Sequence, residues 1–325
     1  MQWLRYIKIE LDEGDGNVET LDINSLRVRF KISQMSMETP NSAEIVITNF
    51  RKETAIKIIK DRSMDKMVKI WLGYINGAQA MVFQGNLVQA RYDRESPTDT
   101  IFTLHAHDGF SGHNFAFVNK TLKGGSTGMD VYNALLDTMK PFGINKGFAT
   151  SALQNINYER AVTLFGNTNL YARSLALSAK STWTIHNGKY HVIGIKEPLP
   201  GTAVVLNPDT GLIGSPEQNR NGINFRVLIN PEIAVAQIVK CDESFISEAG
   251  YDYGPFGNYN VFGDPVGSNL NLPKINADGL YKVIRIDWFG DTWGTPWYMD
   301  LECLDITASG APKGSDLEPY ITYGS

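Results

Sequence analysis

Three histidines lie close together, and histidine is a common zinc ligand. His105 and His107 are two positions apart in an apolar run, Asp108 follows them, and His113 is a few residues further on. Side chains two positions apart on a strand point to the same face, so two of these rings would converge. A zinc site needs three or four converging ligands. We favour the alternative, that these are ordinary polar residues near a sheet edge, and we expect neither a metal nor a cofactor.

A glycine-rich stretch, KGGSTG at residues 123–128, resembles a phosphate-binding loop before a helix. The P-loop motif places its lysine after the second glycine, whereas Lys123 precedes both glycines in this chain. A helix is predicted over residues 127–139, and Ser126 or Thr127 can cap it with Asp130 near the third helical position. We therefore expect a capped helix start rather than a nucleotide site.

The chain also lacks the arrangements that typify hydrolases. Residues 211–215, GLIGS, do not form the Gly-x-Ser-x-Gly elbow that exposes a nucleophilic serine. Carboxylate pairs such as Asp12 with Glu13, or Asp242 with Glu243, lie in turns or at strand ends. No apolar pocket that would raise a catalytic pKa surrounds them in the sequence. We predict no catalytic residue and no enzymatic activity.

A long loop rich in glycine, asparagine and aromatic residues is predicted over residues 246–279. Loops of this length in compact domains are usually functional. Aromatic side chains among glycines and asparagines give contact area at low entropic cost, so we expect an interface with a sugar or a protein. The aromatic residues concerned are Tyr251, Tyr253, Phe256, Tyr259 and Phe262.

Composition sets the class of protein. The chain has 325 residues, of which 42% are hydrophobic and 20% charged, which favours two or three domains with substantial cores. The net charge of −5, without clustered lysine and arginine, argues against a general nucleic-acid binder.

No apolar run reaches the length of a membrane helix. The N-terminus has no apolar signal segment, so we expect synthesis and folding in a cytoplasm. We expect Cys241 and Cys303, each ending an apolar run, to be buried.

The order of strand and helix signals predicts an α+β, mainly β protein. Residues 1–110 read as a β domain, 111–201 as a small α+β domain, and 202–310 as a second β domain; 311–325 form a polar tail. In the middle part, helices are predicted over 127–139 and 169–180. A hairpin follows, with its turn at Asn187-Gly188, the strongest short hairpin signal.

The clearest strand covers residues 26–32, where apolar and cationic residues alternate. The apolar residues would face the core and the cations water or a polar partner. We take the cations, together with the five aromatic residues of the long loop, as a candidate assembly interface. These cations are Arg27, Arg29 and Lys31. Further along, Asn49 is predicted to cap a short helix that ends near residue 60.

The stretch 204–241 is strand, turn, loop, hairpin and strand, punctuated by Asn207-Pro208, Asn221-Gly222 and Asn230-Pro231. Its TGLIGSP segment resembles one in the baseplate hub proteins of contractile-tailed phages, where it leads into the last β-barrel. Four further segments match that family in order. They read NSAEIVITNF, WLGY, MVFQGNLVQA and HAHDG.

The resemblance implies two tube-like antiparallel β-barrel domains, residues 1–110 and 202–310, flanking an α+β insertion. Hubs of this family form a homotrimeric ring that joins the hexameric tail tube to the trimeric central spike and lets DNA pass through its lumen. The N-terminal region of type VI secretion spike proteins is related. The chain ends soon after the second predicted barrel, so we expect the spike to be a separate chain.

The resemblance further implies a virion protein of the baseplate, with tube, spike and other baseplate proteins as partners and no membrane insertion. Two alternatives stay open at the level of sequence. One is a tail-associated hydrolase of the host cell surface, and the other is a carbohydrate-binding adhesion protein.

Overall fold

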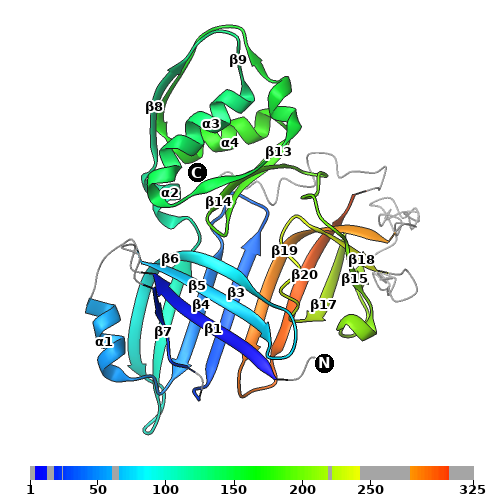
Figure 1. Ribbon diagram of the computed structural model, residues 1–325. Helices are drawn as coiled ribbons and strands as arrows, with labels where there is room; N and C mark the ends of the chain where they lie inside the picture. Colours follow the sequence, from blue (N-terminus) through cyan, green and yellow to red (C-terminus); the bar gives the residue numbers. More distant parts are fainter. Residues whose placement is uncertain are drawn as a thin grey trace, which may run out of the picture.

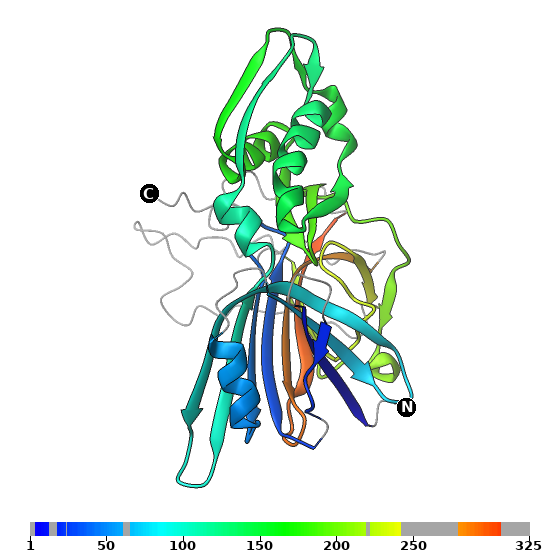
Figure 2. The ribbon, with the colours of Figure 1, turned by 60° about the vertical axis from the view of Figure 1, so that its left-hand side comes forward.

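The computed structural model describes residues 4–12, 18–23, 25–60, 66–218, 222–241 and 279–306. A large curved sheet forms the body of the molecule, and a smaller unit with three helices stands on one end of it (Figure 1). The same arrangement is visible from the side (Figure 2). The prediction of a mainly β, α+β protein is confirmed.

The N-terminal strands alternate buried and solvent-facing residues, as their sequences predict. They are β1 (Arg5–Asp12), β2 (Val18–Thr20), β3 (Val28–Met35), β4 (Ser42–Thr48), β5 (Met67–Tyr74), β6 (Gln79–Arg94) and β7 (Thr100–His107). In β3, Val28, Phe30 and Ile32 are buried, while Lys31 is exposed. Helix α1 (Lys52–Lys60) buries Ala55 and Ile58 against this part of the sheet.

The prediction that Asn49 caps α1 is wrong, because the helix begins at Lys52. Asn49 adopts a positive φ of 56°. Its side-chain Nδ2 donates to Asp99 Oδ1 (3.0 Å), and its side-chain Oδ1 accepts from the Thr100 N–H (2.9 Å). Asparagine tolerates this backbone conformation and bonds locally in turns, so it closes the connection between β4 and β7 instead.

The C-terminal strands agree with the predicted strands in position. They are β15 (Val204–Leu206), β16 (Glu217–Gln218), β17 (Ile223–Leu228), β18 (Ile238–Cys241), β19 (Leu280–Asp291) and β20 (Trp297–Asp305), with a 3-10 turn, η3 (Pro208–Thr210), after β15. Cys241 ends β18 and Cys303 lies within β20. Both side chains are 1% exposed, so the prediction that they are buried is confirmed.

The two sets of strands form one sheet rather than two separate ones. Its order is β16-β17-β20-β19-β3-β4-β7-β6-β5-β1-β2, with β18 pairing β19 and β15 beyond the main path. The junction is the antiparallel pair β19–β3, in which Arg285 to Asp291 lie opposite Met35 to Arg29. One hydrophobic cluster includes residues from both sets, among them Ile32, Ile45, Val227 and Trp288.

The unit between these two sets has its own hydrophobic cluster, drawn from residues 116 to 192. Its elements are α2 (Phe110–Phe115), β8 (Phe117–Leu122), β9 (Ser126–Thr127), α3 (Gly128–Met139), η1 (Lys140–Phe142), β10 (Asn145–Ala149), η2 (Ser151–Asn155), β11 (Asn157–Tyr158), β12 (Val162–Asn167), α4 (Thr168–Ser178), β13 (Ser181–His186) and β14 (Lys189–Gly194). The predicted helices and the Asn187-Gly188 hairpin are confirmed. The short strands before α4 were not predicted.

Buried polar groups fasten this unit to the large sheet. The N–H groups of Asn187 and Gly188 donate to the two oxygens of Asp108 (2.5 and 3.1 Å), and Asn41 Nδ2 donates to the Ile185 carbonyl (3.0 Å). On β19, the Lys282 amine donates to the carbonyls of residues 194 and 195 (2.8 and 2.9 Å). Asp108 and Lys282 are each 1% exposed, so these bonds are shielded from water.

Across the described ranges, the longest helices have about a dozen residues, and none combines the length and apolarity needed to cross a membrane.

Candidate assembly surface

A continuous polar face covers the sheet on the side opposite its core, and strands from both ends of the chain contribute to it. Cross-strand pairing places its residues in rows. One row is Arg226, Asp300, Asp287, Ser33, Ser42 and His107. The next row is Leu228, Tyr298, Phe289, Lys31, Glu44 and His105. Because strand side chains alternate between faces, the residues between these rows point into the core.

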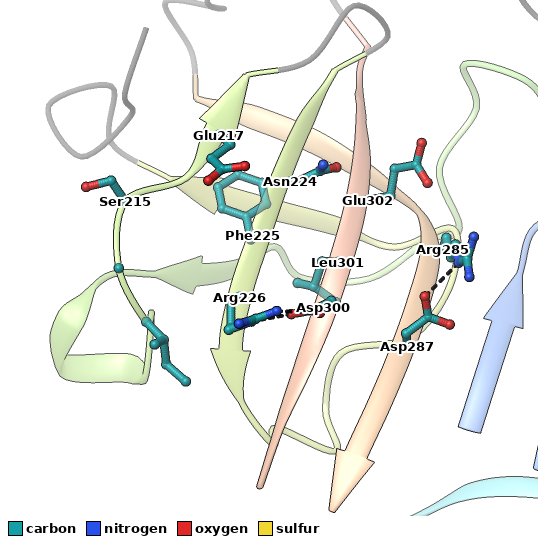
Figure 3. Close-up of a pocket in the computed structure, with 12 residues that line it drawn as sticks. Ser215, Glu217, Asn224, Phe225, Arg226, Arg285, Asp287, Asp300, Leu301 and Glu302 are labelled. Atoms are coloured by element: carbon teal, nitrogen blue, oxygen red, sulfur yellow. Dashed lines mark hydrogen bonds and ion pairs between the residues drawn. The ribbon is translucent and has the colours of Figure 1, made fainter. Parts of the chain in front are cut away.

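One end of this face is hollowed into an open groove of about 610 Å³. Its floor is formed by β17, β20 and β19, and the segment around Ser215 forms one wall (Figure 3). The Arg226 guanidinium makes a two-pronged bond to Asp300, with distances of 2.7 and 2.9 Å. Arg285 Nε lies 2.8 Å from the Asp287 carboxylate. Glu217 and Glu302 also line the groove, so its two arginines face four carboxylates and the lining is net acidic.

Aromatic rings on the same face contact the cations. The Arg226 guanidinium lies 4.6 Å from the Tyr298 ring centre, and the Lys31 amine lies 5.6 Å from the Phe289 ring centre. Such contacts hold long cationic side chains close to the sheet. The surface consequently offers both polar and aromatic area for contact. Two of the groove's carboxylates, Asp287 and Asp300, are held in ion pairs, an arrangement suited to contact rather than to proton transfer.

The three predicted interface cations have different surroundings. Arg29 and Lys31 lie on the polar face, where Arg29 pairs with Glu95 (2.7 Å). Arg27 precedes β3 and binds Asp291 at the end of β19, with a shortest distance of 2.6 Å. Arg27 therefore helps to fix the β3–β19 junction. The role of all three cations in assembly stays a prediction.

Removing the Arg27 side chain is expected to destabilise the fold by about 1–3 kcal/mol, because it deprives a buried carboxylate of its cationic partner. The Asp291 side chain is 7% exposed, and the hydrogen bonds from Arg27 lower the pKa of Asp291 to about 2. Urea unfolding of Arg27→Ala at neutral pH measures the loss. The stabilisation is present above pH 3.8, the ordinary carboxyl value, and is lost as pH falls toward 2.

Arg29→Ala is the matched control, because Arg29 and Glu95 are 34% and 40% exposed. Exposed ion pairs contribute less than about 1 kcal/mol. Equal losses in the two variants would contradict the structural role assigned to Arg27.

The three histidines considered as zinc ligands lie in two different places. His105 and His107 lie on the polar face, and His113 stacks on Trp183 at 5.6 Å between ring centres. Burial lowers the pKa of His107 and of His113. In the part of the chain that the structure describes, no group of three or more histidine, cysteine or acidic side chains is arranged to hold a metal.

The glycine-rich stretch is a helix start, as predicted. Thr127 is the N-cap of α3, and Asp130 completes a capping box by accepting from the Thr127 N–H (2.8 Å). Asp12 binds Lys69 (2.9 Å), whereas Glu13, Asp242 and Glu243 lie outside the described residues.

The five aromatic residues of the predicted loop interface also lie outside the described residues. They are Tyr251, Tyr253, Phe256, Tyr259 and Phe262.

Sequence reasoning missed the acidic and aromatic residues that β19 and β20 place on the polar face. Their period-2 alternation with Trp288 and Leu301 was a usable signal.

Comparison with solved structures shows that the fold is that of tail proteins. A 43 kDa tail protein of prophage MuSo2 from Shewanella oneidensis has a TM-score of 0.56 at 10% identity, covering 93% of this chain and 99% of that one. A tail protein from Neisseria meningitidis MC58 has a TM-score of 0.56 at 9% identity, covering 95% and 99%.

A third structure is the E. coli c3393 protein, a component of the type VI secretion system with structural similarity to the T4 bacteriophage tail proteins gp27 and gp5. Its TM-score is 0.52 at 8% identity, covering 87% of this chain and 75% of that one. No protein-family model and no curated protein sequence matches the chain. The resemblance to tail hub proteins is thus confirmed at the level of the fold.

Proposed function

We propose that this protein is the structural hub of a phage-tail baseplate. It forms a homotrimeric ring that joins the hexameric tail tube to the trimeric central spike and surrounds the DNA channel. The observation that carries this proposal is the single sheet joining the strands of residues 1–110 to those of 202–310 through β3 and β19. The tail proteins that share the fold support it.

In this proposal, residues 1–110 and 202–310 are two tube-like wall pieces, and residues 111–201 are a peripheral insertion. Three chains with two similar wall pieces each give six pieces around one axis, which matches a sixfold tube to a threefold spike. The β3–β19 junction makes the two pieces of one chain a continuous surface, so they can act together in the ring.

The polar face of the sheet is the proposed lining of the channel. On strands β3, β4, β17, β19 and β20 it carries the cations Arg29, Lys31, Arg226 and Arg285 and the acidic residues Glu44, Asp287, Asp291, Asp300 and Glu302, so cations are not in excess. Tight DNA binding requires clustered, unneutralised cations that release counterions. A lining without an excess of cations lets DNA pass without holding it.

The proposed role is mechanical, and the protein has no catalytic part in it. The partners are the tube, the spike and other baseplate proteins, and the protein assembles in the host cytoplasm and ends in the virion. Asp287 and Asp300 of the groove are each held in an ion pair, and this favours a mechanical role over that of a cell-surface hydrolase.

The purified protein is expected to have the mass of a trimer and to show rings with a central hole in negative-stain images. Light scattering after gel filtration measures the mass over a range of concentrations, with and without the tube and spike proteins. A monomer under all of these conditions would overturn the proposal. Turnover of peptidoglycan or surface polysaccharide by the purified chain would favour the hydrolase instead.

A further inference from the structure

The two-stranded ribbon formed by β8 and β12 has one covered side and one open side. Val118, Leu122 and Leu164 are buried on the covered side, in the core of the α+β unit, where α3 and α4 lie (Figure 1). The alternate side chains point the other way, and none of them is ionisable. We call these six residues the ribbon face: Phe117, Asn119, Thr121, Thr163, Phe165 and Asn167.

The one cation of these two strands points away from the ribbon face. Lys120 lies opposite Leu164 in the pairing, so its side chain leaves on the covered side, where its amine is 3.9 Å from Asp137 of α3. Lys123 and Arg160 lie outside the paired residues. Nucleic acids are held by lysine and arginine side chains that contact phosphates, and the ribbon face offers neither. An uncharged face complements an uncharged ligand, because a charged ligand would lose hydration without gaining a partner.

Two phenylalanine rings project from the ribbon face at right angles to each other. Phe117 and Phe165 are 54% and 64% exposed, and their rings meet edge to face with centres 5.2 Å apart and planes at 89°. Successive nucleic-acid bases stack on aromatic faces, and two perpendicular rings do not offer two parallel faces. The face of one ring and the edge of the other form an apolar corner instead, and this corner fits the C–H face of a sugar ring.

Amide groups stand beside this apolar corner. Asn119 pairs with Phe165, and Asn167 pairs with Phe117, so each ring has an amide next to it on the ribbon face. The Asn167 oxygen caps α4, which leaves its amide nitrogen to donate outward. An amide both donates and accepts hydrogen bonds, as each hydroxyl group of a sugar does.

The backbone that carries the Phe165 ring is fixed by a side chain of α4. The Tyr171 hydroxyl accepts from the Phe165 N–H (3.1 Å) and donates to the Phe165 carbonyl (3.0 Å). Both backbone groups of this residue are therefore bonded on the outer edge of β12. A ligand that binds a surface held in this way does not have to order a loop first, which lowers the cost of binding.

The size of the ribbon face suits a small ligand better than a protein. The Thr121 and Thr163 hydroxyls, 3.1 Å apart, close the face about 13 Å from Phe117, at 3.3 Å per strand residue. Each phenylalanine exposes on the order of 100 Å², and the six side chains together roughly 400 Å². One side of a standard protein interface buries about twice that area. A small ligand needs less area, and a few polar groups fix its orientation.

We propose that the ribbon face binds a neutral glycan. The corner of Phe117 and Phe165 packs against a sugar ring, and the amides of Asn119 and Asn167 bond to its hydroxyl groups. The site belongs to the α+β unit and takes no residue from the β3–β19 junction, so it adds a ligand to the proposed hub without depending on ring formation. The ribbon face has no carboxylate to protonate or attack a glycosidic bond, so the bound glycan stays intact.

Binding of the purified full-length chain to an array of immobilised neutral and acidic oligosaccharides tests the proposal. We expect binding to neutral oligosaccharides that does not weaken as salt is raised, because no ion pair contributes to it. Calorimetric titration with the best-bound neutral oligosaccharide then gives the Kd. Phe117→Leu and Phe165→Leu should each raise this Kd at least about tenfold, since leucine keeps apolar area but has no flat ring, and Phe165→Trp should preserve binding.

Ile75→Ala is the control, because Ile75 is 55% exposed between β5 and β6 and should leave the Kd unchanged. The thermal unfolding midpoints should stay the same in the ribbon variants, since both phenylalanines are more than half exposed. The proposal is overturned if no neutral oligosaccharide binds, if only acidic ones bind, or if the leucine variants bind as the wild type does. Each of these results leaves the proposed hub intact, whereas glycan binding by a chain that is always monomeric supports this site and overturns the hub.

Discussion

Replacing Gly290 by alanine is expected to lower the free energy of unfolding by about 3 kcal/mol, the upper part of the range for an overfilled core. Gly290 lies on β19, opposite Phe30 of β3 on one side and Trp297 of β20 on the other. A Cβ atom at position 290 would lie 2.2 Å from Phe30 Cζ. The Phe30 ring is 5% exposed and meets the Trp297 ring edge to face at 5.5 Å, so it has no free space into which to move.

The consequence extends beyond one side chain, because Gly290 lies in the only pair of strands that joins the two parts of the sheet along its described path. Pushing Phe30 aside would open the β3–β19 junction and disturb the surface that the proposed ring depends on. Circular dichroism should show a thermal midpoint lowered by several degrees, and a lower yield of trimer should accompany it.

Two further variants make this result interpretable. Phe30→Leu removes the far end of the ring, so Gly290→Ala should cost less than about 1 kcal/mol in that background, a coupling that a double-mutant cycle measures. Gly201→Ala is the control, because the nearest atom to its added Cβ is 4.0 Å away. An unchanged Gly290→Ala protein would show that the junction tolerates a wider spacing than the structure indicates.

The local elements were predictable because their signals are local. The alternation in β3, the Asn187-Gly188 turn and the Thr127 capping box each depend on residues a few positions apart. The β3–β19 pairing joins residues 250 or more positions apart, and neither strand's own sequence identifies the strand it pairs with. Alternation fixes which face is buried but leaves the register and the neighbour open.

The ribbon of β8 and β12 shows a different limit. In β8, Phe117 and Val118 are adjacent apolar residues, and a sequence rule would bury the larger one. The structure buries Val118 and exposes Phe117, because α3 covers that side of the ribbon. The exposure of Phe117 therefore could not be predicted from the sequence of the strand. The alternation in β19 and β20 could have shown which of their residues face water, but the rows they form with the other strands depend on long-range register.

Buried groups at the junction and within the α+β unit should make the stability of the chain depend on pH, and Asp108 and His191 have opposite effects. Asp108 accepts the turn N–H groups of residues 187 and 188, and its burial raises its pKa to about 7. His191 is 8% exposed, its Nδ1 accepts from the Phe148 N–H (3.0 Å), and its burial lowers its pKa to about 4.

Between pH 4.5 and 6.5, Asp108 binds a proton in the folded chain and His191 binds one in the unfolded chain. The folded chain keeps a proton on Asp108 that the unfolded chain, with the ordinary value of 3.8, has lost, so this group stabilises the fold less as pH rises toward 7. The unfolded chain binds a proton on His191 below its ordinary value of 6.5 that the folded chain excludes, so this group loses its stabilising effect as pH falls toward 4.

Each proton that differs between the two states changes stability by about 1.4 kcal/mol per pH unit. Asp108→Asn removes the falling contribution, so the slope of unfolding free energy against pH should become more positive by about 1.4 kcal/mol per unit. His191→Asn keeps an oxygen able to accept from the Phe148 N–H and removes the rising contribution, so the slope should become more negative by the same amount.

Urea titrations at several pH values in this window measure both slopes, and the two variants control each other because their expected changes have opposite signs. Asp108→Asn should also be less stable at every pH, since one of its two acceptor oxygens becomes a donor that faces a backbone N–H. A change of slope in the same direction in both variants would contradict a protonated Asp108 and a neutral His191 in the folded chain. If the α+β unit of Asp108→Asn separates from the sheet at a lower urea concentration than the rest of the chain unfolds, the bonds of Asp108 are the first contacts of the junction to break.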